Sequence, residues 1–321
     1  MDYERGGIQK DNYDKSEVVF VLCPFCKANY YKELYKERGV LGIVRCLKCD
    51  LLYVNPRLKE PDKIYWGDAE KYYLEARLIF EGKAGHHRDP NYQADLRLIS
   101  KYKPSGKLLD IGTNMGFFLR NAKIKGWDAY GIEPSPSLSE MARKYFGLNV
   151  KTAFLENAGF DDKFFDVVTL TDVFEHLTQP KRMLATIHKI IKDDGILFIK
   201  VPNGLFNLLK LQGAKLTGRL KNYDIFDSYE HVVHYSQKTL TLMLESSGFR
   251  VIDVRMGKPI QLPVWHNYVG QYYQYPTPWG LDFKRQTART IFYLVSLIEF
   301  MIRFKNIGYF ASNIIVIARK K

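Results

Sequence analysis

The feature that most constrains this fold is an alternation of short apolar segments with amphipathic ones from about residue 90 onward. The apolar runs have the length of buried strands, and helical patterns separate most of them. The expected strands are Lys107–Ile111, Ala129–Glu133, Asn149–Lys151, Phe165–Leu170, Gly195–Val201, Phe249–Val254 and Asn313–Arg319. The expected helices are Phe117–Lys125, Ser137–Phe146, Lys181–Ile191 and Thr239–Ser247. This order predicts an α/β fold, a seven-stranded, mostly parallel sheet with helices on both faces.

All four cysteines lie in a single stretch before this region. They form two pairs, Cys23-Pro-Phe-Cys26 and Cys46-Leu-Lys-Cys49, with 19 residues between the pairs. Two thiolates on each of two tight turns can complete a closed tetrahedral site, which is typical of structural Zn²⁺. Disulfides are rare in reducing compartments, and a redox pair needs no matched second copy. The spacing therefore predicts a small zinc ribbon over residues 18–57.

A glycine-rich turn, Asp110-Ile-Gly-Thr-Asn-Met-Gly116, connects the first expected strand to the first helix. Such a turn lets a ligand approach the backbone, and the helix N-terminus adds free amide donors. Glu133 ends the next strand, where it can accept hydrogen bonds from both ribose hydroxyls. A nicotinamide dinucleotide needs three spaced glycines, and Asp110 would repel its pyrophosphate. The carboxylate of Asp110 instead favours a cofactor with an amino-acid tail, because it suits the ammonium group of that tail.

In the order of these motifs the chain resembles the class I S-adenosylmethionine-dependent methyltransferases, over about residues 105–255. The segment Asp172-Val-Phe-Glu-His-Leu177, followed by Pro180, is similar to the branch with ubiquinone O-methyltransferases and sugar or small-molecule methyltransferases. A four-cysteine ribbon that ends in Val54-Asn-Pro-Arg57 also resembles methyltransferases of bacterial surface-polysaccharide and natural-product pathways. The resemblance implies a Rossmann-like sheet and an enzyme that uses S-adenosylmethionine.

The resemblance also implies cofactor-binding roles for particular positions. The expected contacts are Asp110, Gly112, Asn114 and Gly116 with the methionine part, Glu133 with the ribose, Pro134, Ala153 and Phe154 with the adenine, and Thr171 and Asp172 with the sulfonium. Asn114 stands where the family usually has glycine, but asparagine tolerates positive φ better than most residues. Phe154 stands near a place where an acidic adenine-binding residue is common.

Methyl transfer from a sulfonium requires mainly alignment of the acceptor, and a hydroxyl or carbon acceptor also needs a base. The candidate bases are His231, His176 and His234. Each could equally be a capping or core residue, and Glu175 and Asp172 could be helix caps. A metal pair formed by His231 and His234 has no carboxylate cluster beside it.

The sequence divides into the ribbon, a charged and aromatic helical connector at 58–89, and a methyltransferase domain at 90–321. Two inserts in that domain, 203–236 and 258–312, interrupt the alternation and are expected to cap the substrate. Within the second insert, Ile291–Ile302 predicts a helix that is either buried or in peripheral contact with a membrane.

The net charge of +13 is compatible with anionic partners or with a solvated basic surface. The N-terminus has no apolar core of a signal peptide, so a cytoplasmic enzyme is expected. The expected acceptor is a small molecule, such as a sugar nucleotide or a glycolipid precursor. The alternatives are an RNA methyltransferase, which the missing amino-methylation motif makes less favoured, and a non-catalytic cofactor-binding module. The sequence leaves the oligomeric state open.

Overall fold

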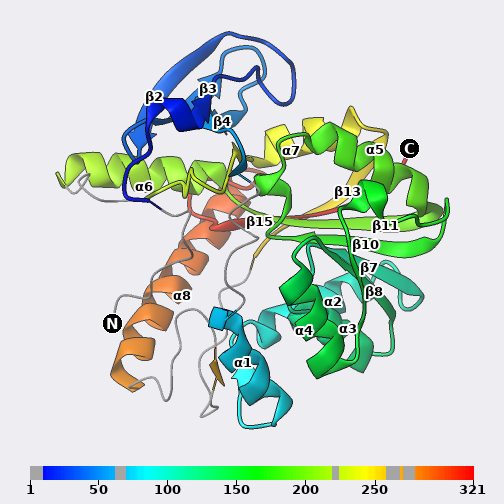
Figure 1. The fold of residues 1–321 in the computed structure, drawn as a ribbon. Helices are drawn as coiled ribbons and strands as arrows, with labels where there is room; N and C mark the ends of the chain where they lie inside the picture. The colour runs from blue at the N-terminus through cyan, green and yellow to red at the C-terminus, as the bar shows by residue number, and fades with distance from the viewer. Residues whose placement is uncertain (1–9, 62–69, 219–223, 258–267, 270–278) are drawn as a thin grey trace.

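The computed structural model describes residues 10–61, 70–218, 224–257, 268–269 and 279–321. At its centre lies a seven-stranded sheet (Figure 1). Its strands are β7 (Lys107–Ile111), β8 (Asp128–Glu133), β9 (Asn149–Thr152), β10 (Phe165–Thr171), β11 (Ile191–Pro202), β13 (Phe249–Met256) and β15 (Asn313–Lys320). The order is β13-β15-β11-β10-β7-β8-β9, and only β15 runs antiparallel to its neighbours. The predicted Rossmann-like sheet is therefore confirmed, with every expected strand within four residues of its bounds.

Helices cover both faces of this sheet, as Figure 1 shows. One face carries α2 (Asp89–Ser100), α3 (Phe117–Ile124) and α4 (Pro136–Phe146), and the other carries α5 (Pro180–Ile190) and α7 (Gln237–Glu245). Each helix turns an apolar stripe inward, so two separate apolar layers form, one on each face. Local signals set the bounds: α4 starts at the N-cap Ser135 and ends at Gly147, which has a φ of 58°.

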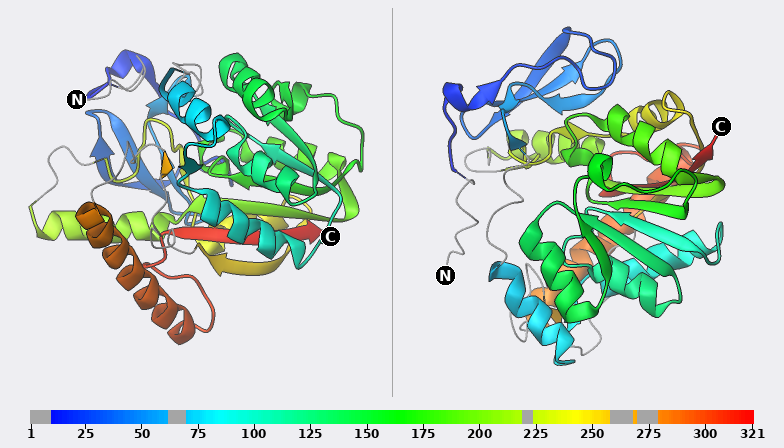
Figure 2. Two further views of the ribbon diagram at one scale, coloured as in Figure 1. Left: turned by 90° about the horizontal axis from the view of Figure 1, so that it is seen from below. Right: turned by 45° about the vertical axis from the view of Figure 1, so that its right-hand side comes forward.

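The N-terminal ribbon lies at one end of this sheet, above the helix α6 (Gly204–Leu216) in Figures 1 and 2. Its elements are η1 (Lys15–Glu17), β1 (Val18–Val19), β2 (Tyr31–Glu37), β3 (Leu41–Cys46), β4 (Leu52–Val54) and β5 (Arg57–Leu58). Strand β12 (Val233–His234), from the first insert, pairs antiparallel with β4 and extends the ribbon sheet to four strands. Apolar side chains of the ribbon, among them Leu41 and Ile43, pack in one buried cluster with Leu211 of α6.

One buried carboxylate joins the ribbon to the first insert. Glu37, at the end of β2, is only 3% exposed and accepts hydrogen bonds from the backbone N–H groups of Ile225, Phe226 and Ser228, at 2.8, 2.8 and 3.0 Å. Hydrogen bonds to an ionised carboxylate are stronger than neutral ones. The loop that precedes β12 therefore takes its shape from the ribbon.

The connector contains the helix α1 (Glu70–Phe80) and the short strand β6 (Gly85–His86), which pairs with β14 (Tyr268–Val269). The long helix α8 (Trp279–Ile302) runs away from the sheet (Figure 1), and it starts well before the apolar stretch at Ile291. Parts of the connector and of the second insert, 62–69, 258–267 and 270–278, lie outside the described residues. Among the helices in the described ranges, none is long and apolar enough to cross a membrane. The domain bounds and the capping role of the inserts stay predictions.

Candidate active site and metal centre

The glycine-rich turn after β7 has a backbone that few residues adopt. Gly112, Asn114 and Gly116 have φ values of 67°, 53° and 81°. A side chain at Gly112 would also collide with Val173, because its Cβ would lie 2.7 Å from Cγ2 of that residue. Asn114 takes the left-handed conformation that glycine favours, as the sequence predicted. The turn thus leaves its backbone open to a ligand.

Glu133, the last residue of β8, braces this turn. Its carboxylate accepts hydrogen bonds from the backbone N–H groups of Asn114, at 2.8 Å, and Ser135, at 3.0 Å. Burial nevertheless raises the pKa of this carboxyl above its usual value. A carboxylate can accept about four hydrogen bonds, so capacity remains for ribose hydroxyls.

Asp110 lies at the base of the same turn and is only 3% exposed. Thr169 donates a hydrogen bond of 2.7 Å from its hydroxyl to Oδ1 of Asp110. Burial raises the pKa of this carboxyl to about 7, although the hydrogen bond from the Thr169 hydroxyl acts to lower it. A cation placed against Asp110 would stabilise its ionised form.

A cavity of about 470 Å³ opens at the carboxyl ends of β7 and β10, where the order of the parallel strands reverses. Ligands in open α/β sheets bind at such a point, and the volume suits a small-molecule site. Five of the expected cofactor residues line it: Asp110, Gly112, Asn114, Thr171 and Asp172. We call it the transfer cavity.

The other expected cofactor residues lie around the turn but outside this lining. Gly116 is the N-cap of α3, while Glu133 is the last residue of β8 and Pro134 follows it. Ala153 donates its backbone N–H to the carbonyl of Glu133, at 3.2 Å. Phe154 beside it exposes 42% of its surface.

Two of the three candidate histidines lie together in the transfer cavity. The rings of His176 and His231 have centroids 4.7 Å apart, and both residues line the cavity. Burial lowers the pKa of His176 to about 3 and that of His231 to about 4, so both rings are neutral at physiological pH. His234 is placed differently, on β12, 3% exposed and packed against Phe226. It lies outside the cavity lining.

The sequence did not identify the part of the site that the connector supplies. Arg88 precedes α2 and donates a hydrogen bond of 2.7 Å to Oδ2 of Asp172, whose φ of 54° is rare for a residue with a side chain. His86 and His87 line the same cavity. The only sequence signal was the run His86-His87-Arg88 itself, inside a segment assigned to a connector.

A second cavity, of about 420 Å³, adjoins the first. Both are lined by Arg88, Tyr92, Thr171, Asp172 and Asn313, so the two volumes share a wall. The lining of the second cavity combines polar and charged residues with aromatic ones, which include Phe206, Phe292, Tyr293 and Phe310, and we call this cavity the aromatic cavity. Two of these come from α8 and one from α6, so both inserts contribute to it.

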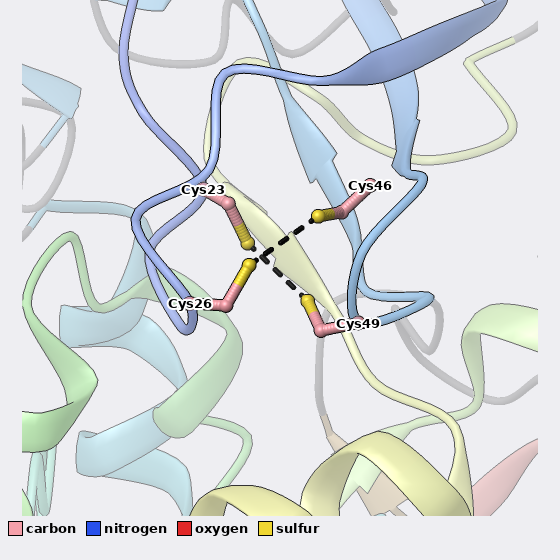
Figure 3. A group of neighbouring side chains, drawn as sticks. All are labelled: Cys23, Cys26, Cys46 and Cys49. Carbon is pink, nitrogen blue, oxygen red and sulfur yellow. Dashed lines mark hydrogen bonds between the residues drawn. The ribbon is translucent and has the colours of Figure 1, made fainter.

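The four cysteines converge between the two turns of the ribbon (Figure 3). The sulfurs of Cys23 and Cys49 are 3.5 Å apart, as are those of Cys26 and Cys46, and all four lie within 4.8 Å of one another. The edge of a tetrahedron with Zn–S bonds of about 2.3 Å is about 3.8 Å, whereas a disulfide is about 2.05 Å. Burial raises the pKa of the Cys23 thiol to about 11, so a bound cation would favour its ionised form. The residues fit a four-thiolate metal site.

Comparison with known proteins agrees with this geometry. A family model described as a methyltransferase domain matches residues 84–254, more than half of the chain. A ubiquinone biosynthesis O-methyltransferase of Coxiella burnetii is 28% identical over 154 residues, which cover 46% of this chain and 64% of that protein. An uncharacterized protein of Methanocaldococcus jannaschii is 27% identical over 161 residues, 50% of this chain and 73% of that protein. The match to the Coxiella protein thus spans less than two thirds of its length.

Solved structures of methyltransferases are also similar. An S-adenosylmethionine-dependent methyltransferase of Archaeoglobus fulgidus aligns over 81% of this chain and 97% of its own, at 19% identity and a TM-score of 0.43. The magnesium protoporphyrin IX methyltransferase of Synechocystis aligns over 82% and 94%, at 13% identity and a TM-score of 0.45. Both scores are below 0.5, so these similarities carry no part of the functional argument.

Proposed function

The chain belongs to the methyltransferase domain family, as an S-adenosylmethionine-dependent enzyme of class I, and we propose that it methylates a hydroxyl oxygen of a small-molecule acceptor. The observation that supports this most directly is the transfer cavity, where the cofactor turn at Asp110 meets His176 and His231. The Coxiella relative, an O-methyltransferase by name, supports oxygen as the methylated atom. Carbon methylation by the same cavity is the alternative.

The cofactor side of the proposal follows from the turn. Asp110 would face the aminoacyl ammonium of S-adenosylmethionine, and Glu133 the ribose hydroxyls. Pro134, Ala153 and Phe154 would border the adenine, and Thr171 and Asp172 the sulfonium. The bound cofactor supplies a methyl group that is already activated, so the chain has to orient the acceptor and remove its proton.

The acceptor side combines polar and apolar surfaces. The transfer cavity carries Glu230 and His231, while the aromatic cavity beside it can take an apolar portion of the acceptor. The lining cations are already paired, Arg88 with Asp172 at 2.7 Å and Lys200 with Asp95 at 2.7 Å. A nucleic-acid backbone needs cations that are free to neutralise phosphates. An amphipathic small molecule, such as a glycolipid precursor, therefore suits this site better than RNA.

We expect His231→Ala to lower kcat about 100-fold, the typical contribution of a group that assists proton removal. The affinity for S-adenosylmethionine should stay unchanged, because His231 lies on the acceptor side of the cavity. The measurement is transfer of a labelled methyl group to metabolite extracts, together with calorimetry of cofactor binding. His188→Ala, on α5 away from the cavity, is the matched control. Turnover at the wild-type rate in His231→Ala would remove this residue from the proposal.

We also propose that α8 rests on a membrane surface from which an amphipathic acceptor enters. Five apolar side chains form one exposed stripe along this helix: Ile291, Leu294, Ile298, Met301 and Ile302. They recur at helical spacing, so they share one face, while Phe292 and Tyr293 line the aromatic cavity. The exposed side chains of Arg303 and Lys305 end the stripe, which suits anionic head groups.

Sedimentation with phosphatidylglycerol vesicles tests this contact. Replacing Ile298 and Met301 with aspartate should lower vesicle binding more than about tenfold, because both are exposed, at 60% and 77%, and would enter the lipid interface. Replacing Ile124, on α3, and Leu242, on α7, with aspartate adds the same two charges elsewhere, at positions 69% and 38% exposed, and this protein should bind vesicles as the wild type does. Equal binding by all three proteins, or none by the wild type, would contradict the proposed contact.

A further inference from the structure

A third cavity, of about 220 Å³, adjoins the aromatic cavity. It lies between α2 and the strands β11, β13 and β15. It shares Asn91 and Lys200 with the aromatic cavity, and it has no described lining residue in common with the transfer cavity. The three cavities therefore follow one another, with the aromatic cavity in the middle. We call the third one the cationic groove.

Four basic side chains line the cationic groove: Arg97, Lys101, Lys200 and Arg255. The one acidic residue in its described lining, Asp95, pairs with Lys200 at 2.7 Å. Arg255 pairs with Asp253 at 2.6 Å. Arg97 and Lys101 are exposed, and neither has an ion pair among the described residues. Two positive charges of the groove are thus left uncompensated.

Lys200 adds a buried charge to this groove. It lies on β11 and is only 6% exposed, and its partner Asp95 is only 4% exposed. An ammonium group has three N–H donors. In the described part of the chain, Lys200 donates a single hydrogen bond, to Oδ2 of Asp95. Because buried donors are normally satisfied, the remaining donors of Lys200 suit an anion that enters the groove.

The dipole of α2 explains part of this arrangement without a ligand. Cations near the C-terminus of a helix are stabilising, and Arg97 lies in the last turn of α2, with Lys101 as its C-cap. The dipole does not explain Arg255, which comes from β13, or the buried Lys200 on β11. A cleft lined by charges of one sign from separate elements attracts ligands of the opposite sign.

We propose that the cationic groove binds a phosphate or diphosphate group of the methyl acceptor. The guanidinium groups of Arg97 and Arg255 offer paired N–H donors that match phosphate oxygens, and Lys101 adds a compact charge. A site for a whole drug-sized ligand measures about 300–1,000 Å³, so the smaller groove suits one charged group. Two uncompensated cations likewise suit a single phosphate or diphosphate, whereas an RNA backbone presents a series of phosphates.

This inference rests on the proposed function and specifies its acceptor as a phosphorylated small molecule. The anionic group lies in the cationic groove, and the rest of the acceptor extends through the aromatic cavity. Its hydroxyl group then reaches the transfer cavity, where the methyl group is transferred. The anion anchors the acceptor at the end opposite to the reacting oxygen, so its binding contributes to orientation.

Calorimetry of the full-length protein with inorganic pyrophosphate, at low ionic strength, tests the groove. Combining Arg97→Ala with Lys101→Ala should lower the affinity for pyrophosphate more than about tenfold, because this variant removes the two uncompensated charges. Both positions are exposed and alanine is the best helix former, so the variant should fold. Its unchanged affinity for S-adenosylmethionine verifies the fold.

Combining Lys125→Ala with Arg250→Ala gives the matched control. Lys125 is the C-cap of α3, as Lys101 is of α2, and Arg250 is an exposed residue of β13 outside the groove lining. This variant loses the same net charge and should bind pyrophosphate within about twofold of the wild type. Equal losses in the two double variants, or no binding by the wild type, would overturn the inference.

Two further probes identify what carries the anion. Uridine diphosphate and geranyl diphosphate place it on a nucleoside and on an apolar chain, so the one that binds more tightly than pyrophosphate indicates the carrier. If neither does, the extension into the aromatic cavity is wrong.

The result is separable from the proposed function, because pyrophosphate binding is measured without methyl transfer. Cofactor binding without pyrophosphate binding would remove the groove and leave the methyltransferase standing. Pyrophosphate binding without cofactor binding would instead remove the proposed function.

Discussion

Asp110→Asn is expected to weaken S-adenosylmethionine binding about 100-fold, or about 3 kcal/mol. The substitution preserves the shape of the side chain and its contact with Thr169, and it removes the charge that would face the cofactor ammonium. Charge-assisted hydrogen bonds in buried sites are the strongest that a side chain offers. Calorimetry measures the change directly, with Asp128→Asn, an exposed carboxylate at the start of β8, as the matched control.

The same carboxyl gives cofactor binding a pH dependence. Because burial raises the pKa of Asp110 to about 7, the group is ionised above that pH and protonated below it. Binding of a cationic ammonium should therefore weaken as the pH falls, by about tenfold between pH 8 and pH 6. Asp110→Asn should lose this dependence. A variant that binds within twofold of the wild type at both pH values would exclude Asp110 from the ammonium contact.

The double substitution of Cys23 and Cys26 with serine is expected to unfold the ribbon and to stop turnover, while cofactor binding persists. A structural zinc contributes about 10 kcal/mol to the folding of such modules. The effect should reach the transfer cavity because β12 pairs with β4 and because Glu37 orders the loop at 225–228. His231 follows that loop directly. The Asp110 turn, which belongs to the central sheet, should keep its affinity for S-adenosylmethionine.

Three measurements separate these effects. Metal analysis should find one equivalent fewer than in the wild type, hydrogen exchange should rise at residues 225–236, and the calorimetric affinity should change less than about threefold. Lys48→Ser, an exposed position in the second cysteine turn, is the control. A cysteine variant that keeps slow exchange and full turnover would show that the ribbon needs no metal.

The sequence predicted most of the central sheet because its strands are short apolar runs with turn residues between them. Lys107–Ile111 has the same bounds in the structure, whereas β11 starts four residues before the expected Gly195 because it extends past the apolar run. The cofactor turn was also predictable, since its glycines and acids are close in sequence. The four cysteines converge as their spacing predicts.

Local sequence patterns could not predict the contacts between segments that are far apart in the sequence. Nothing in Val233 or Tyr53 alone indicates that they pair across the ribbon and the first insert. Likewise, Glu175 could be assigned to a helix cap as readily as to the transfer cavity, because its place in the cavity lining becomes evident only in three dimensions.

The three hydrogen bonds from Glu37 to the first insert have a consequence for how this architecture can vary. The ribbon is first in the chain, yet it completes a loop some 190 residues later, so it cannot be exchanged between relatives as an independent module. A chimera that replaces residues 18–57 alone would leave three backbone donors without their acceptor. A workable exchange would have to transfer residues 204–236 together with the ribbon, so acceptor specificity and ribbon identity should be inherited as one unit.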